Sequence, residues 1–168
     1  MNIIPSFILF LLAPFLGVIG VFSAPSSAAT TSADTQRKDD ISRFLVAAND
    51  YQTNNSGKTP WDSGKTNKQW VRRYIDEDCS ADTPEQADDS CSENFRDPDG
   101  EPYFFVYKGS LSPYENKKAD ITKSHGIYVY TNAQCGNDSG SVEGVKSSRQ
   151  FAMLYKLSDG TVYCNDNS

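Results

Sequence analysis

The chain repeats one motif of residues that bind phosphate in other proteins. Ser-Gly-Lys-Thr occurs at residues 56–59 and again at residues 63–66. A phosphate-binding loop requires a glycine five positions before the glycine of Gly-Lys-Thr, because its backbone N–H groups surround the phosphates. Gln52 and Thr59 stand at those two positions. Neither copy of the motif therefore predicts a nucleotide site.

A second motif has the residue types of nucleophilic hydrolysis. Residues 137–141 read Asn-Asp-Ser-Gly-Ser, which is similar to the loop that holds the nucleophile of serine proteases, and the single histidine, His125, precedes them. The charged part of the chain, about 135 residues, is too short for the two β-barrels of such an enzyme. A general acid–base role for His125 has no second histidine to support it. We therefore expect no catalytic residue, and a small secreted hydrolase is our third hypothesis.

The third motif has oxygen ligands of the kind that calcium prefers. Asp97-Pro98-Asp99-Gly100-Glu101 looks like part of a calcium loop, but Phe95 stands where the pattern needs a further ligand. A tight turn built on Pro98 and Gly100 is the preferred interpretation. The four cysteines form no C-x-x-C pair, which argues against zinc. The sequence therefore predicts neither a metal nor a cofactor.

The cysteines are more informative as disulfides. The chain has Cys79, Cys91, Cys135 and Cys164, which allow three pairings. We expect the sequential pairs Cys79–Cys91 and Cys135–Cys164, which by loop closure would contribute about 3 and about 3.5 kcal/mol. The alternative is four unpaired thiols in a cytosolic domain. Disulfides favour an oxidising compartment and therefore an exported domain.

An apolar segment occupies the N-terminal end of the sequence. Residues 3–22 are nearly all apolar, and residues 1–33 contain no charged side chain. Twenty residues in a helix span about 30 Å, the thickness of a bilayer's hydrocarbon layer. We therefore interpret residues 1–23 as a transmembrane or filament-core segment, and a signal peptide cleaved after Ala29 is the alternative. Arg37 and Lys38 follow the segment. Basic residues next to a membrane segment tend to stay in the cytoplasm, so these two residues argue against export of the head.

The remaining chain divides into residues 24–33, which form a neck or a helix kinked at Pro25, and a globular head, residues 34–168. All charges lie in the head, and its formal charge of −6 argues against a general nucleic-acid surface. Residues 34–54 predict a helix with one apolar stripe that packs on a sheet: Ile41, Phe44, Leu45, Ala48 and Tyr51. A shorter helix is expected at residues 67–76, and an acidic loop at residues 76–93.

The second half of the head changes from helical to strand periodicity. Strands rich in Tyr, Phe and Val are expected at residues 102–108, 126–131, 150–157 and 161–164, and Asp159-Gly160 predicts a tight hairpin between the last two. The long connections are residues 109–125 and the Gly/Ser-rich residues 132–149. The predicted fold class is α+β, with a long N-terminal helix packed on a small antiparallel meander of about four strands.

In this order of elements the chain resembles the type IV pilin and pseudopilin family. The similarity lies in residues 34–41, in the helix end Tyr51–Pro60 and in the Asp97–Tyr103 turn. It also lies in Cys135 and Cys164, which stand before and after the turn of the last hairpin. The site at which prepilin peptidase cleaves members of the family is absent. The family also has a glutamate early in its apolar helix, which pairs with the N-terminus of a neighbouring subunit, and the apolar Ile8 stands near that position. One hypothesis is that translation starts upstream of Met1 and that a leader is missing.

The resemblance implies a non-enzymatic structural subunit or minor component of a type IV pilus-like filament, serving adhesion, motility or uptake. Residues 3–22 would pack against other pilin subunits or lie in the membrane. Residues 132–149 would form a variable loop, and the head would lie outside the cytoplasm, at the cell surface or in a filament. The alternative is a stand-alone binding module, membrane-anchored or secreted, which the apolar Ile8 favours.

Overall fold

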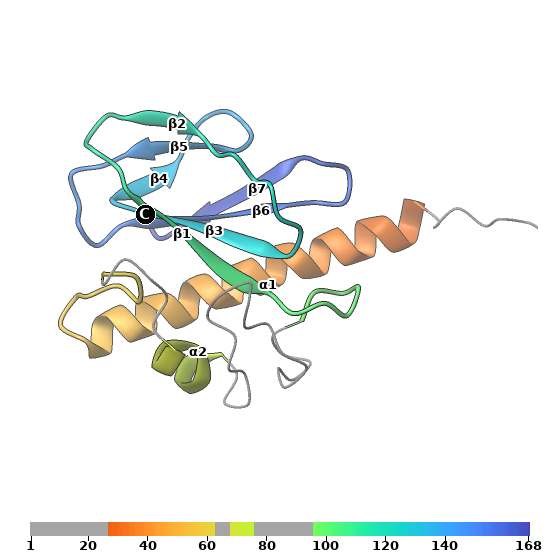
Figure 1. Cartoon of the computed structure of the whole chain (residues 1–168), viewed down its shortest axis with the longest axis horizontal. Helices are drawn as coiled ribbons and strands as arrows, with labels where there is room; N and C mark the ends of the chain where they lie inside the picture. The colour runs from red at the N-terminus through yellow and green to blue at the C-terminus, as the bar shows by residue number, and fades with distance from the viewer. Residues whose placement is uncertain (1–26, 63–67, 76–95) are drawn as a thin grey trace, which may run out of the picture.

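The structure is a computed structural model that describes residues 27–62, 68–75 and 96–168. It has a mixed α+β architecture (Figure 1). The elements, in chain order, are α1 (Ser27–Asn54), α2 (Lys68–Tyr74), β1 (Phe104–Ser110), β2 (Asn116–Lys118), β3 (Gly126–Thr131), β4 (Ala133–Cys135), β5 (Ser141–Gly144), β6 (Phe151–Lys156) and β7 (Val162–Asp166). The acidic segment and its predicted Cys79–Cys91 disulfide lie outside the described residues.

Helix α1 begins earlier than the apolar stripe predicts. Residues 27–33, for which we left a neck or a kinked helix open, are helical. The helix ends in a left-handed turn, where Ser56 and Gly57 have φ values of 57° and 81° and the Gly57 N–H donates to the Gln52 carbonyl at 2.9 Å. Glycine adopts positive φ without steric cost, which explains this ending. Neither helix of the described residues is long and apolar enough to cross a membrane.

The predicted stripe of α1 faces the core of the head. Ile41, Phe44 and Ala48 are buried, and Leu45 and Tyr51 are partly buried against the same apolar cluster. Trp70 of α2 and Trp61 of the loop before it belong to the same cluster. Their rings pack edge to face, with 5.1 Å between the ring centres. Helix α1 therefore covers one face of the main sheet, as Figure 1 shows.

The main sheet has four strands in the order β1-β3-β6-β7. Strands β3 and β6 are buried on both faces, which explains why they read as continuous apolar runs. Ile127 and Val129 of β3 face the helices, whereas Tyr128 and Tyr130 face the opposite side. The predicted hairpin at Asp159-Gly160 joins β6 to β7, which pair antiparallel.

The expected antiparallel meander is wrong at its first step. Strands β1 and β3 are parallel, with Phe104 opposite Gly126, while the other two pairings are antiparallel. Parallel neighbours need a crossover that returns the chain to the starting end of the sheet. Residues 111–125 make this return over the face opposite α1, and β2 is part of it.

The two long connections contain a second sheet, which the sequence did not predict. Strands β2, β5 and β4 pair antiparallel in that order and cover the face of the main sheet opposite α1 (Figure 1). Residues 132–149, expected as a variable loop, hold β4 and β5. Gly144 is required here by close packing, because a Cβ at this position would lie 1.8 Å from the Ser112 carbonyl oxygen. The head therefore has three layers: helices, main sheet and small sheet.

Candidate functional site

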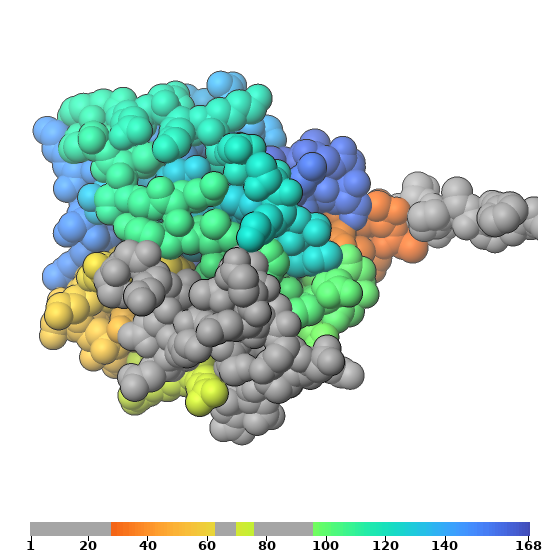
Figure 2. All heavy atoms as spheres, in the orientation of Figure 1, coloured from red at the N-terminus to blue at the C-terminus, as the bar shows by residue number. Residues whose placement is uncertain are grey.

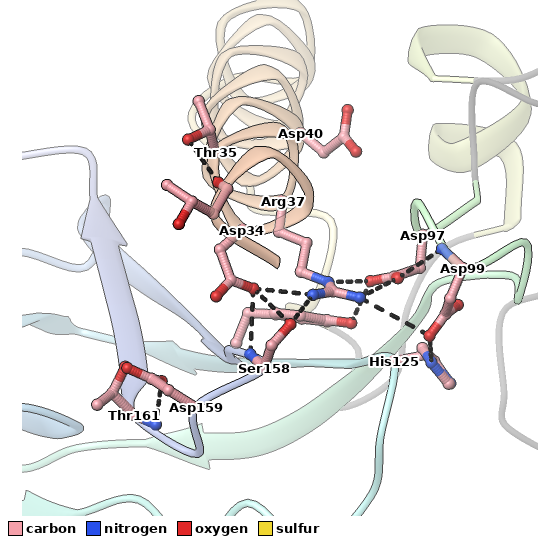
Figure 3. Close-up of polar contacts among 12 residues, drawn as sticks. Asp34, Thr35, Arg37, Asp40, Asp97, Asp99, His125, Ser158, Asp159 and Thr161 are labelled. Atoms are coloured by element: carbon pink, nitrogen blue, oxygen red, sulfur yellow. Dashed lines mark hydrogen bonds and ion pairs between the residues drawn. The ribbon is translucent and has the colours of Figure 1, made fainter. Parts of the chain in front are cut away.

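A buried arginine joins three parts of the head that are distant in sequence. Arg37, on α1, donates from Nε to Asp97 Oδ2 at 2.8 Å and from Nη2 to Asp97 Oδ1 at 2.6 Å. Its Nη1 donates to Asp34 at 2.8 Å and to the hydroxyl of Ser158, in the turn between β6 and β7. Figure 3 shows the guanidinium between the two carboxylates. We call Arg37, Asp97, Asp34, Ser158 and Tyr155 the arginine joint.

The turn that carries Asp97 has the geometry that its sequence favours. The Gly100 N–H donates to the Asp97 carbonyl at 2.8 Å, and Gly100 has a φ of 93°. The Asp99 N–H donates to Asp97 Oδ1 at 3.1 Å. These bonds hold the carboxylate of Asp97 in place for Arg37, and its side chain is fully buried. A bidentate arginine–carboxylate pair is strong because two charge-assisted hydrogen bonds act in parallel.

The charges of the arginine joint are stabilised in the folded state. Burial alone would raise the pKa of Asp97, but hydrogen bonds from Arg37 and Tyr155 outweigh it and lower the pKa from 3.8 to about 2. The bond to Asp97 likewise raises the pKa of Arg37. Burial, together with the 2.5 Å bond that its hydroxyl donates to Asp97, raises the pKa of Tyr155. At neutral pH Asp97 and Arg37 are therefore charged and Tyr155 is neutral.

A second buried carboxylate, that of Asp40, lies on α1 about one turn after Arg37. Asp40 accepts a 3.0 Å hydrogen bond from the hydroxyl of Tyr103 and a 3.1 Å bond from Arg43, whose side chain is largely exposed. Burial outweighs these bonds and raises the pKa of Asp40. Burial and the nearby Asp40 carboxylate also raise the pKa of Tyr103. The fold therefore disfavours the charged form of Asp40 and favours that of Asp97.

Three side chains at the edge of the joint have the donor types of a metal site. Asp97, Asp99 and His125 each offer one ligand atom, and these atoms lie within 4.8 Å of one another. His125 Nε2 lies 2.9 Å from Asp99 Oδ2, and the residue has a positive φ of 60°. Both oxygens of Asp97 already accept hydrogen bonds from Arg37, however. A cation here would have to displace a guanidinium, so the arrangement favours an ion-pair network over a metal centre.

A pocket of about 460 Å³ opens beside the joint. Its walls come from the segment before β3, from the end of β6 and from the turn that follows β6. They include Arg37, Asp99, Lys123, His125 and Lys156. Arg37 is already neutralised by Asp97 and Asp34, so the remaining charged groups of the wall are Lys123 and Lys156 and the single carboxylate of Asp99. The two lysines give the wall of the pocket an excess of positive charge.

The arginine joint lies where α1 leaves the head. Residues 28–36 of α1 are exposed or half-exposed, and Arg37, the residue that follows them, is buried. In Figures 1 and 2 the first turns of α1 project from the head. The joint therefore fixes α1 to the head at the point where the helix leaves it.

The structure confirms one of the two predicted disulfides. Cys135, at the end of β4, is bonded to Cys164, in β7, so this bond connects the small sheet to an edge of the main sheet. The other pair, Cys79 and Cys91, lies outside the described residues. The arginine joint itself was not predicted. Arg37 and Asp40 extend the spacing of Ile41, Phe44 and Ala48 by one turn, and this periodicity is the signal that could have found them.

Comparison with known proteins gives no match for this chain, whether against family models, curated sequences or solved structures.

Proposed function

We propose that the protein is a structural, non-enzymatic subunit or minor component of a type IV pilus-like filament. In this function the apolar residues 3–22 pack with the same segments of other copies, and the head is displayed at the surface. The arginine joint supports the proposal more than any other observation, because it fixes a projecting helix at its point of emergence. A subunit that transmits force between a filament core and a displayed head needs a rigid connection there.

Two further features fit this function. Helix α1 covers an antiparallel-rich sheet of four strands, and a disulfide closes the C-terminal part of the head. An apolar segment of 20 residues precedes α1 in the sequence, long enough for a filament core or a membrane. Neither feature involves chemistry on a substrate. The protein would act by being stacked and displayed.

The direct test is the composition of filaments from cells that make the protein. Filaments sheared from the cells are purified and analysed by mass spectrometry, and we expect peptides of the head in the sheared fraction. The matched variants are Ile8→Lys and Ile8→Leu. The lysine places a charge in the apolar segment, which costs about 3 kcal/mol in a bilayer centre, whereas leucine preserves its apolar character. We expect Ile8→Lys to remove the protein from filaments and Ile8→Leu to leave it there.

The alternative, a stand-alone binding module, predicts a different result. The protein would then be absent from sheared filaments, and deletion of its gene would leave the filaments unchanged. That combination would refute the filament proposal.

A further inference from the structure

The lysines whose side chains the structure describes lack ion-pair partners. Arg37, Arg43 and His125 form ion pairs, whereas none of these eight lysines takes part in one. All the lysines whose side chains are described are exposed: Lys38, Lys58, Lys108, Lys117, Lys118, Lys123, Lys146 and Lys156. Their charges are therefore available to a partner.

Four of these lysines lie on β1, on the edge strand β2 of the small sheet and in the connection between β2 and β3. Lys108 Nζ lies 4.9 Å from the ring centre of Tyr128, and Lys117 Nζ lies 5.8 Å from that of Tyr130. The Tyr128 hydroxyl accepts a 2.9 Å hydrogen bond from the backbone N–H of Lys123. Tyr128 and Tyr130 are buried on the same side of β3. We call Lys108, Lys117, Lys118 and Lys123 the lysine face.

The lysine face differs in charge from the chain as a whole. Between residues 102 and 131 the four lysines are opposed only by Glu115 and Asp120. The backbone of β2, which carries two of the lysines, is an edge strand whose three residues are all exposed. Contacts with tyrosine rings restrict two of the lysine side chains before any partner arrives, which lowers the entropic cost of binding. In Figure 2 this part of the chain, coloured green to cyan, forms an open surface.

The negative charge of the protein is concentrated elsewhere in the sequence. Residues 76–101 contain 11 of the 22 acidic residues and a single basic residue, Arg96. The rest of the chain has 15 basic and 11 acidic residues, an excess of positive charge. Within residues 76–93 there are eight acids and no base. One molecule thus carries both a polyanionic segment and a surface of unpaired lysines.

We propose that the lysine face binds the acidic segment 76–93 of a second copy of this chain. The inference rests on the proposed function, since a filament would hold many copies close together. Complementary charge steers two surfaces into one register and disfavours contact between like surfaces. Lys123 also lines the pocket beside the arginine joint, which offers room for side chains of the bound segment.

The test uses a fluorescent peptide of residues 76–93, with serine in place of both cysteines, and the full chain in a neutral detergent. Fluorescence anisotropy measures the binding. We expect saturable binding that weakens about tenfold or more when salt rises from about 0.02 to about 0.3 M, because exposed charges are screened. A peptide with every acid replaced by its amide should not bind.

The decisive variants have equal charge and different positions. The triple variant Lys108→Glu, Lys117→Glu, Lys123→Glu should lower the affinity about tenfold or more. The control Lys38→Glu, Lys58→Glu, Arg72→Glu changes the net charge equally at exposed positions of α1, of the loop after it and of α2, and it should lower the affinity less than about threefold. A peptide with lysines in place of its acids should bind the first variant better than the wild-type chain.

The inference is overturned if both triple variants weaken binding equally, if the first has no effect, or if the amide peptide binds as well as the acidic one. This result is separable from the filament test. Lack of peptide binding by a chain that is present in filaments refutes only the contact. Peptide binding by a chain that is absent from filaments supports the contact and refutes the filament function.

Discussion

The two faces of the main sheet are held by different kinds of interaction. On one face, α1 is fixed by an aromatic core and by the buried arginine joint at one end. On the other face, the small sheet packs on Tyr128, Tyr130 and Leu154 and is tied to β7 by the Cys135–Cys164 disulfide. The helix side therefore depends on protonation, whereas the small-sheet side depends on redox state. Substitutions on each face separate these two dependencies.

The largest effect is expected on the helix side, from loss of the buried cation. Arg37→Met leaves Asp97 buried without its partner, which typically costs about 3–5 kcal/mol. Urea unfolding of the full chain in detergent, followed by the fluorescence of Trp61 and Trp70, measures the loss. The control is Arg43→Met, because Arg43 is largely exposed and its pair should contribute less than about 1 kcal/mol. Equal losses from both variants would contradict the structural role of the joint.

The next effect is expected on the opposite face. Breaking the Cys135–Cys164 bond with Cys135→Ser should lower the free energy of unfolding by about 3.5 kcal/mol, because the closed loop spans 29 positions of the sequence. Cys164→Ser and the double variant should give the same loss, since either change removes the whole bond. The same urea titration measures all three. A double variant much less stable than the single ones would show that the thiols contribute beyond their bond.

The sequence predicted the elements that bury apolar side chains and missed those held by backbone pairing. Strands β3 and β6 are long apolar runs, and the structure places them within one residue of the prediction. Strand β2 consists of Asn116, Lys117 and Lys118, all exposed, and no apolar pattern identifies such a strand. The Gly/Ser content of residues 132–149 suggested a loop, although Gly144 serves close packing.

The arginine joint shows a second limit of sequence reasoning. Helical spacing places Arg37 and Asp40 on the buried face, so their burial could have been predicted from the sequence. Their partners could not, because Asp97 lies 60 residues from Arg37 and Tyr103 lies 63 residues from Asp40. Only the fold brings these residues together. The Asp97 turn was recognised correctly, but its role as an acceptor for α1 depends on that fold.

The smallest effects concern the two buried carboxylates, which should respond to pH with opposite signs. The folded pKa of Asp97, about 2, lies below its ordinary 3.8. Its ionised form therefore stabilises the fold above pH 3.8, and this contribution disappears as pH falls through about 2. Asp97→Asn should cost about 2 kcal/mol at pH 7, and the cost should shrink in acid.

Asp40 should show the reverse behaviour. Burial raises its folded pKa, so the folded protein binds a proton at higher pH than the unfolded chain does. Ionised Asp40 therefore opposes folding at neutral pH, and this penalty is relieved as pH falls through the raised pKa. Asp40→Asn removes the penalty and can still accept the Tyr103 hydrogen bond. The difference in unfolding free energy between Asp40→Asn and wild type should therefore favour the variant more at pH 7 than at pH 3. The same difference for Asp97→Asn should be more unfavourable at pH 7 than at pH 3. Urea titrations at both pH values measure the two differences. Changes of the same sign would refute the contrast between Asp97, whose charge is paired with Arg37, and Asp40, whose burial disfavours its charge.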